Sequence, residues 1–193
     1  MEDERPSDYF IGLLNQGLFP KEFPFDMLLA LAGIKQSPVH HPEGDVWAHT
    51  MLVVDNAARE KKRSKDPRVL MWAALLHDIG KPATTRVRRG RITAYVHDKE
   101  GGILAARFLS ACGQDQDFSA NVSALVRWHM QPLFAAKNLP FFDPDAMAAQ
   151  ANVCEVALLG FCDRLGRGLM SEDAIDKERR DIAYFEKKCV TAR

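Results

Sequence analysis

One segment near the middle of the chain limits the possible folds more than any other. From Val69 to Ile79 the sequence is almost wholly apolar, and Asp66-Pro67 just ahead of it is a typical helix start. A helix that is apolar on all sides must be covered by other elements. The sequence therefore predicts a central helix that ends at Gly80-Lys81-Pro82 and is surrounded by other helices.

Helical spacing dominates the rest of the chain as well. Apolar periodicity, with Ser7 or Asp8 and Asp45 as caps, predicts further helices over residues 7–18, 25–34, 46–62, 98–112, 117–130, 144–165 and 171–188. The segment 84–96 holds Arg-Arg-Gly-Arg and β-branched residues, which favour a loop or a short hairpin. We predict an all-α fold with irregular helix packing, formed by a single domain over residues 1–193.

Six polar side chains occupy positions where helical spacing expects core. His49, for example, follows Val46 by three residues and precedes Val53 by four. A single inward histidine is usually a hydrogen-bonded core residue, whereas an unpaired buried carboxylate is costly. Several such residues on separate helices indicate a shared partner, and a divalent metal is the simplest one. The six are His49, His77, Asp78, His97, His129 and Asp163.

Composition narrows the class of protein. The 193 residues include 26 Lys and Arg against 26 Asp and Glu, and zero net charge argues against binding nucleic acid by bulk charge or reading DNA sequence. No apolar run reaches the roughly 18 residues that would predict a membrane span. The acidic start, Met1-Glu2-Asp3-Glu4-Arg5, is unlike a signal peptide, and the four cysteines form no C-x-x-C pair. We expect a cytoplasmic protein with reduced cysteines.

The ordered set of histidines and aspartates resembles the pattern H…HD…H…H…D of HD-superfamily metal-dependent phosphohydrolases, and residues 77–81 reproduce its HD-x-G-K form. Residues 41–50 (His-Pro-Glu-Gly-Asp-Val-Trp-Ala-His-Thr), 73–78 and the Asp-Arg-Leu-Gly-Arg of 163–167 are similar to the HD domain of bacterial tRNA nucleotidyltransferases, the CCA-adding enzymes. The resemblance covers about residues 23–168. The Gly-Ser loop and paired aspartates of the nucleotidyltransferase head have no counterpart in the sequence. The resemblance thus implies the phosphohydrolase part without nucleotide addition.

What the resemblance implies is a site for one or two divalent metal ions, with Mn, Ni, Co, Fe, Zn and Mg all open. His49, His77, Asp78 and Asp163 would hold the first ion, and Asp78 would bridge to a second held by His97 and His129. Metal-activated hydroxide would then cleave phosphomonoesters or cyclic phosphodiesters of nucleotides or RNA ends, such as 2′-phosphates and 2′,3′-cyclic phosphates.

Several cations near these residues have two interpretations. Lys81 and Arg167 would join Asp78 as catalytic residues by contacting phosphate, or would simply stabilise helix ends. His41 lies in a Pro-Gly turn and is a loop residue or a substrate contact. The basic segment would guide a phosphate-rich substrate or form a solvated hairpin. Its candidate substrate-binding residues are Arg86, Arg88, Arg89 and Arg91.

Two other functions stay open at this stage. An HD-type nucleotidase would prefer free (deoxy)nucleoside phosphates. A non-catalytic module would bind nucleotides or RNA and keep the metal for structure only. A homodimer is the general expectation for oligomeric state.

Overall fold

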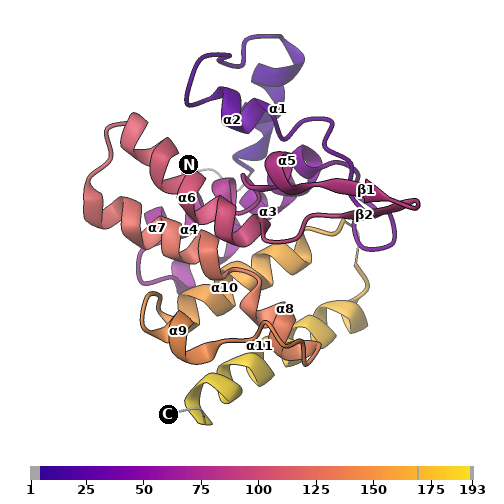
Figure 1. Ribbon diagram of the computed structural model, residues 1–193, viewed down its shortest axis with the longest axis vertical. Coiled ribbons are helices and arrows are strands. Elements are labelled where there is room, and N and C mark those ends of the chain that lie inside the picture. Colours follow the sequence, from indigo (N-terminus) through magenta and orange to yellow (C-terminus); the bar gives the residue numbers. More distant parts are fainter. Residues whose placement is uncertain (1–4, 169, 192–193) are drawn as a thin grey trace.

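The computed structural model describes residues 5–168 and 170–191, and within them the chain is mostly helical (Figure 1). The elements are α1 (Ser7–Asn15), α2 (Asp26–Leu29), α3 (Val46–Glu60), η1 (Lys61–Arg63), α4 (Pro67–Leu76), α5 (Lys81–Thr84), β1 (Arg86–Arg88), β2 (Arg91–Thr93), α6 (His97–Ala111), α7 (Gln116–Trp128), α8 (Gln131–Ala136), α9 (Pro144–Ala148), α10 (Val153–Leu165) and α11 (Glu172–Thr191). The all-α prediction is confirmed.

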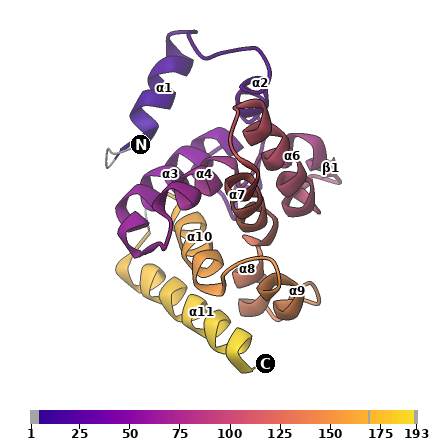
Figure 2. The ribbon, with the colours of Figure 1, turned by 90° about the vertical axis from the view of Figure 1, so that its left-hand side faces the viewer.

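Helix α4 is the centre of the fold, as its apolar sequence predicts. It packs against α3, α7 and α10, and Leu70, Ala73 and Leu76 have no solvent exposure. Burial of such side chains stabilises the fold by about 1.5–3 kcal/mol for each large one. Helices α1 and α11 lie at opposite ends of the molecule (Figures 1 and 2), so the central helices are covered from both sides.

Two of the expected helix caps are present. The carboxylate of Asp45 accepts a hydrogen bond from the amide of Ala48, and that of Asp66 accepts from Arg68 and Val69 at the start of α4. These bonds satisfy amides that lack a partner within the helix. Because Asp45 also accepts from the amide of Gly33 at 2.6 Å, the same carboxylate fixes the loop that leads into α3.

The N-terminal helices differ from the prediction. Helix α1 ends at Asn15 rather than near residue 18, and α2 covers only part of the predicted 25–34 helix. Ser7 is not the cap of α1, because its amide and hydroxyl both donate to the buried carboxylate of Asp55 on α3. The tertiary contact with Asp55 replaces the local cap that the sequence suggested.

The predicted helix over 144–165 is also wrong, because the chain breaks it into α9 and α10. The first helix ends at Ala148, and Asn152 caps the second, with its side-chain oxygen accepting from the amides of Cys154 and Glu155. Similarly, α4 ends at Leu76, and Lys81-Pro82 does not end a helix but begins the short α5. Helix α8 was not predicted either; Pro132 stands in its first turn.

The hairpin expected within 84–96 is present as an antiparallel pair, with Val87 opposite Ile92. It projects from the helices at the right of Figure 1. Among the described residues, no helix is long and apolar enough to cross a membrane.

Candidate metal centre

The structure brings the six predicted metal ligands together from separate elements. His49 comes from α3, His97 is the first residue of α6, and Asp163 lies on α10. His77 and Asp78 directly follow α4, and His129 directly follows α7. The four histidines and Asp78 are buried, while the side chain of Asp163 keeps 17% of its surface exposed. The ligand positions therefore depend on the packing of the central helices.

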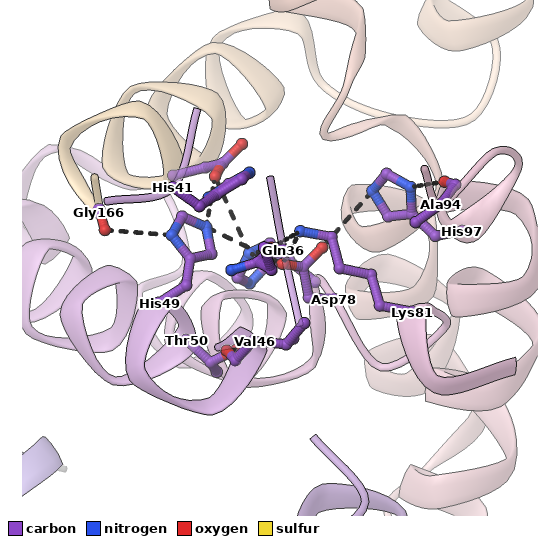
Figure 3. Close-up of polar contacts among 12 residues, drawn as sticks. Gln36, His41, Val46, His49, Thr50, Asp78, Lys81, Ala94, His97 and Gly166 are labelled. Carbon is purple, nitrogen blue, oxygen red and sulfur yellow. Dashed lines mark hydrogen bonds and ion pairs between the residues drawn. The ribbon is translucent and has the colours of Figure 1, made fainter. Parts of the chain in front are cut away.

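Asp78 lies between two groups of histidines. Its Oδ2 is 3.2 Å from Nε2 of His77 and 3.9 Å from Nε2 of His49, whereas its Oδ1 is 3.5 Å from Nε2 of His97. Figure 3 shows His49 and His97 on opposite sides of this carboxylate. Asp78 is shared by two candidate ligand groups, one with His49 and His77 and the other with His97 and His129.

Three of the histidines are oriented in the same way. The Nδ1 atoms of His77, His97 and His129 lie 2.7–2.8 Å from the carbonyl oxygens of Ala74, Ala94 and Val126, each three residues earlier. A carbonyl only accepts, so each Nδ1 carries the proton and donates. This arrangement leaves each Nε2 lone pair free to face the centre, as is usual for metal-binding histidines.

His49 is held by a carboxylate. Its Nδ1 is 2.7 Å from Oε1 of Glu43 and 3.1 Å from the carbonyl oxygen of Gly166, and its Nε2 is 2.9 Å from Oδ1 of Asp163. Burial alone would lower the pKa of His49, but the hydrogen bonds to Asp163 and Glu43 outweigh it and raise that pKa to about 9. The contacts fix the ring with Nε2 on the side of Asp163 and Asp78.

Two glycines allow the backbone approaches that build this site. A Cβ on Gly80 would overlap the carbonyl oxygen of His97 and lie 2.7 Å from the amide of Gly101. A Cβ on Gly166 would lie 3.1 Å from Cε1 of His49. The glycines of the HD-x-G-K and D-x-x-G-R segments thus let α6 and the end of α10 come close enough to complete the ligand set.

The residue before His97 adopts an unusual backbone conformation. Val96 has φ 60° and ψ 16°, in the left-handed region. For a β-branched residue this costs about 1–2 kcal/mol. Such strain is concentrated at functional sites, and here it sets the direction in which α6 begins with His97.

The electrostatics keep the carboxylates ionised and, by lowering the pKa values of His97 and His129, favour the neutral form of these two histidines. Burial opposes ionisation of Asp78, but the adjacent His77 and Lys81 hold its pKa well below the usual value. Burial, together with the charges of His97 and His77, lowers the pKa of His129 to about 4. At neutral pH the centre therefore offers carboxylate oxygens together with the free Nε2 lone pair of His129.

The donor set fits a divalent metal. Nε2 of His77 is buried and has no hydrogen-bond partner among the described residues. Leaving a buried polar atom unpaired is costly, so this nitrogen indicates a missing partner. Imidazole and carboxylate together suit Mn, Fe, Co, Ni and Zn, and the residues do not distinguish among them.

The basic residues predicted to contact phosphate or substrate divide into those that line the cavity at the centre and those that do not. Lys81 is buried, and its Nζ lies 2.7 Å from Oδ2 of Asp78 and 2.5 Å from Oε1 of Gln36. It therefore contacts the centre directly and does not serve as the C-terminal cation of α4. Nη1 of Arg167 lies 3.9 Å from Oε1 of Glu178 on α11. Lys81, Arg167 and His41 line the same cavity of about 890 Å³ as Asp78, His97, His129 and Asp163.

The hairpin arginines lie elsewhere. Arg86, Arg88, Arg89 and Arg91 are exposed, and the structure does not bring them into the wall of the cavity. Their neighbours Thr85, Ile92 and Thr93 do line it. The basic hairpin is thus at the edge of the cavity rather than within it.

Two residues of the site were not identified from the sequence as site residues. Glu43 bonds to His49 and, at 2.8 Å, to Nδ1 of His41. Gln36 accepts from Lys81 and donates to the carbonyl of Asp45 at 3.2 Å. Glu43 stands in the His-Pro-Glu-Gly-Asp segment that carried the family resemblance, which was a signal for it. Gln36 lies in a turn-rich loop without a motif.

Replacing Glu43 by Gln is expected to weaken metal binding by about 10–100-fold, because a carboxylate behind a metal-binding histidine orients the ring and raises its basicity. Titration of both proteins with Mn²⁺ measures the change in metal affinity. Glu155→Gln is the matched control, since Glu155 is also buried but bonds to Ser64 and Lys65. Equal affinity in the Glu43 variant and the wild type would contradict the assigned role.

The comparisons with known proteins agree with this geometry. A family model described as "HD domain" matches residues 46–181, which include all six candidate ligands. The chain belongs to the HD domain family. This family membership places it among metal-dependent hydrolases and confirms the HD resemblance seen in the sequence.

The curated relatives are named multifunctional CCA proteins. The one from Actinobacillus pleuropneumoniae serotype 5b (strain L20) is 42% identical over 84 residues, covering 43% of this chain and 20% of that protein. The one from Verminephrobacter eiseniae (strain EF01-2) is 29% identical over 183 residues, covering 92% of this chain and 42% of that protein. The HD domain described here thus spans less than half the length of these relatives.

Proposed function

We propose that this HD domain hydrolyses phosphoesters of nucleotides or RNA ends, with 2′-phosphates and 2′,3′-cyclic phosphates as the preferred esters. The observation that carries the proposal is the shared carboxylate of Asp78, whose two oxygens face two different histidine groups. A single structural ion would need only one of these groups.

A divalent metal at these ligands would supply a Lewis acid, which lowers the pKa of a water molecule and stabilises negative charge on phosphoryl oxygens. The protein itself supplies the orientation of the ligand atoms. The three histidines held by backbone carbonyls keep their Nε2 atoms directed at the centre. Because these contacts are formed before a substrate arrives, little reorganisation is needed when it binds.

Lys81 and Arg167 are the proposed phosphate contacts. Both line the cavity with Asp78. Lys81 is oriented by Gln36, so its ammonium group stays beside the ligands. Arg167 has a buried Nε without a hydrogen-bond partner among the described residues, and its pairing with Glu178 is long at 3.9 Å. A phosphoryl oxygen would satisfy such a guanidinium well.

The hairpin and the relatives support RNA as the source of the ester. Four exposed arginines project from the cavity edge. Such a surface binds phosphate backbones by charge and is sensitive to salt. The relatives bear a CCA protein name, and the sequence resembles the HD domain of tRNA nucleotidyltransferases.

The test is a phosphoester panel with Mn, Ni, Co or Mg added to the purified protein. We expect faster turnover of adenosine 2′-monophosphate and 2′,3′-cyclic AMP than of adenosine 5′-monophosphate, and a lower KM for an RNA oligonucleotide ending in the same cyclic phosphate. Raising the salt concentration should remove the RNA advantage. A strong preference for 5′-monophosphates would instead indicate a nucleotidase. Metal binding without any turnover would indicate a structural metal.

A further inference from the structure

The cavity that holds the metal centre also has an aromatic wall. Phe134 on α8 and Phe141 in the loop after it line the cavity, with Tyr95 from the segment before α6. The rings of Phe134 and Phe141 are in contact, with their centroids 5.6 Å apart and their planes at 60°. Phe141 is 59% exposed and Tyr95 is 74% exposed. Large apolar rings exposed beside a polar centre are typical of a ligand site.

A buried glutamine fixes this wall relative to the centre. Gln131 is only 2% exposed and follows the ligand His129 by two residues. Its Nε2 donates to the carbonyl of Phe141 at 3.1 Å, and its Oε1 accepts from the amide of Asp143 at 2.8 Å. Both polar groups of one side chain thus tie the Phe141 loop to the turn that carries His129.

The size and chemistry of the cavity indicate the kind of ligand that would contact both regions. At about 890 Å³ it is far larger than a phosphate group needs and within the usual range for organic ligands. One part of its wall offers cations and metal ligands, and another offers aromatic ring faces. A nucleoside phosphoester has a phosphoryl group and a flat π-system joined by a sugar, which matches this combination. Stacking on aromatic side chains is a common way to hold nucleobases.

We propose that Phe141 and Phe134 form a stacking subsite for the nucleobase of the substrate, and that Gln131 is the positioning residue that holds Phe141 in place. The proposal rests on the proposed function, because it assumes that the phosphoester of the same molecule binds at the metal centre. It adds a basis for choosing nucleoside esters over small phosphoesters without a base.

The test compares two substrates and one ligand that cannot be hydrolysed by the proposed reaction. Turnover is measured with adenosine 2′-monophosphate and with glycerol 2-phosphate, and binding is measured with adenosine by isothermal titration calorimetry. We expect Phe141→Ala to raise the KM for the nucleotide and the Kd for adenosine by about 10-fold, in line with the loss of one base-stacking contact. The kcat for both esters and the KM for glycerol 2-phosphate should stay within about twofold of wild type, while Phe141→Trp should restore adenosine binding.

Two further variants separate stacking from general damage. Gln131→Leu removes both hydrogen bonds to the loop and should raise the KM for the nucleotide without lowering the kcat for glycerol 2-phosphate. Tyr9→Ala is the control, because Tyr9 is a 68% exposed aromatic residue on α1 outside the cavity, and it should change nothing.

Unchanged adenosine binding in Phe141→Ala, no adenosine binding to the wild type, or an equal loss with glycerol 2-phosphate would overturn the subsite. Failure of the proposed function gives a different result. If the wild type hydrolyses neither ester, adenosine binding that is lost in Phe141→Ala and restored in Phe141→Trp still supports the subsite.

Discussion

Asp78→Ala is expected to lower phosphoester turnover by at least about 1,000-fold and to abolish tight binding of divalent metal. Asp78 contributes an oxygen to both candidate ligand groups, so its removal disrupts both at once. The variant also leaves Lys81 buried without its carboxylate partner, which costs stability. Turnover with Mn²⁺ and metal content by elemental analysis measure the effect.

The matched control for this variant is Asp55→Ala. Asp55 is another buried aspartate, on the same helix as His49, but it accepts hydrogen bonds only from Ser7 in the described part of the chain. Its removal should cost about 1–3 kcal/mol in the free energy of unfolding while metal content and turnover per folded molecule stay near wild type. If Asp55→Ala and Asp78→Ala lost activity to the same extent, the loss could not be assigned to the ligand role of Asp78.

Gly80→Ala is expected to cost roughly 2–3 kcal/mol in the free energy of unfolding, because the new Cβ would meet the backbone of His97 and Gly101. Backbone atoms cannot rotate away as the end of a side chain can, so α6 must shift. For a chain of this size the Tm should fall by about 5–10 °C. The shift also moves His97 relative to Asp78, and turnover should fall by about 100-fold.

Gly12→Ala provides the comparison for Gly80→Ala. Gly12 lies within α1, and a Cβ there would meet only Nε2 of Gln16, at 3.9 Å. Replacing an unconstrained helical glycine by alanine should raise stability by up to about 1 kcal/mol and leave turnover unchanged. Thermal unfolding monitored by circular dichroism gives the Tm of each variant and so distinguishes Gly80→Ala from Gly12→Ala. A Gly80 variant with wild-type Tm and turnover would refute the close-approach argument.

The sequence predicts the central part of this protein well, for identifiable physical reasons. The apolar run before His77 determines that α4 is buried, and Asp45 and Asp66 act as local caps whose partners lie within three residues. The inward spacing of His49 and Asp163 is a property of their own helices, and His77 and His129 directly follow helices of clear apolar periodicity. This spacing therefore indicates which side chains gather in the centre without knowledge of how the helices pack.

The features that the sequence does not predict depend on long-range contacts. Ser7 looks like a cap, but Asp55, 48 residues away, takes its hydrogen bonds. The contacts of Gln36 with Lys81 and of Gln131 with the Phe141 loop arise only when separate segments meet. Local rules also do not show that the 144–165 segment would be interrupted between Ala148 and Val153, because both parts have helical periodicity.

The most direct test of the central claim is the number of metal ions bound per chain. We would measure it by Mn²⁺ titration of the wild type, His129→Ala and Asp78→Ala, with elemental analysis of each. If Asp78 joins both ligand groups, the wild type should bind two ions per chain. His129→Ala should bind one ion, because only the group with His49 and His77 is intact, and Asp78→Ala should bind no ion tightly. Equal metal content in His129→Ala and the wild type, or no bound metal in the wild type, would contradict a centre in which Asp78 joins two ligand groups.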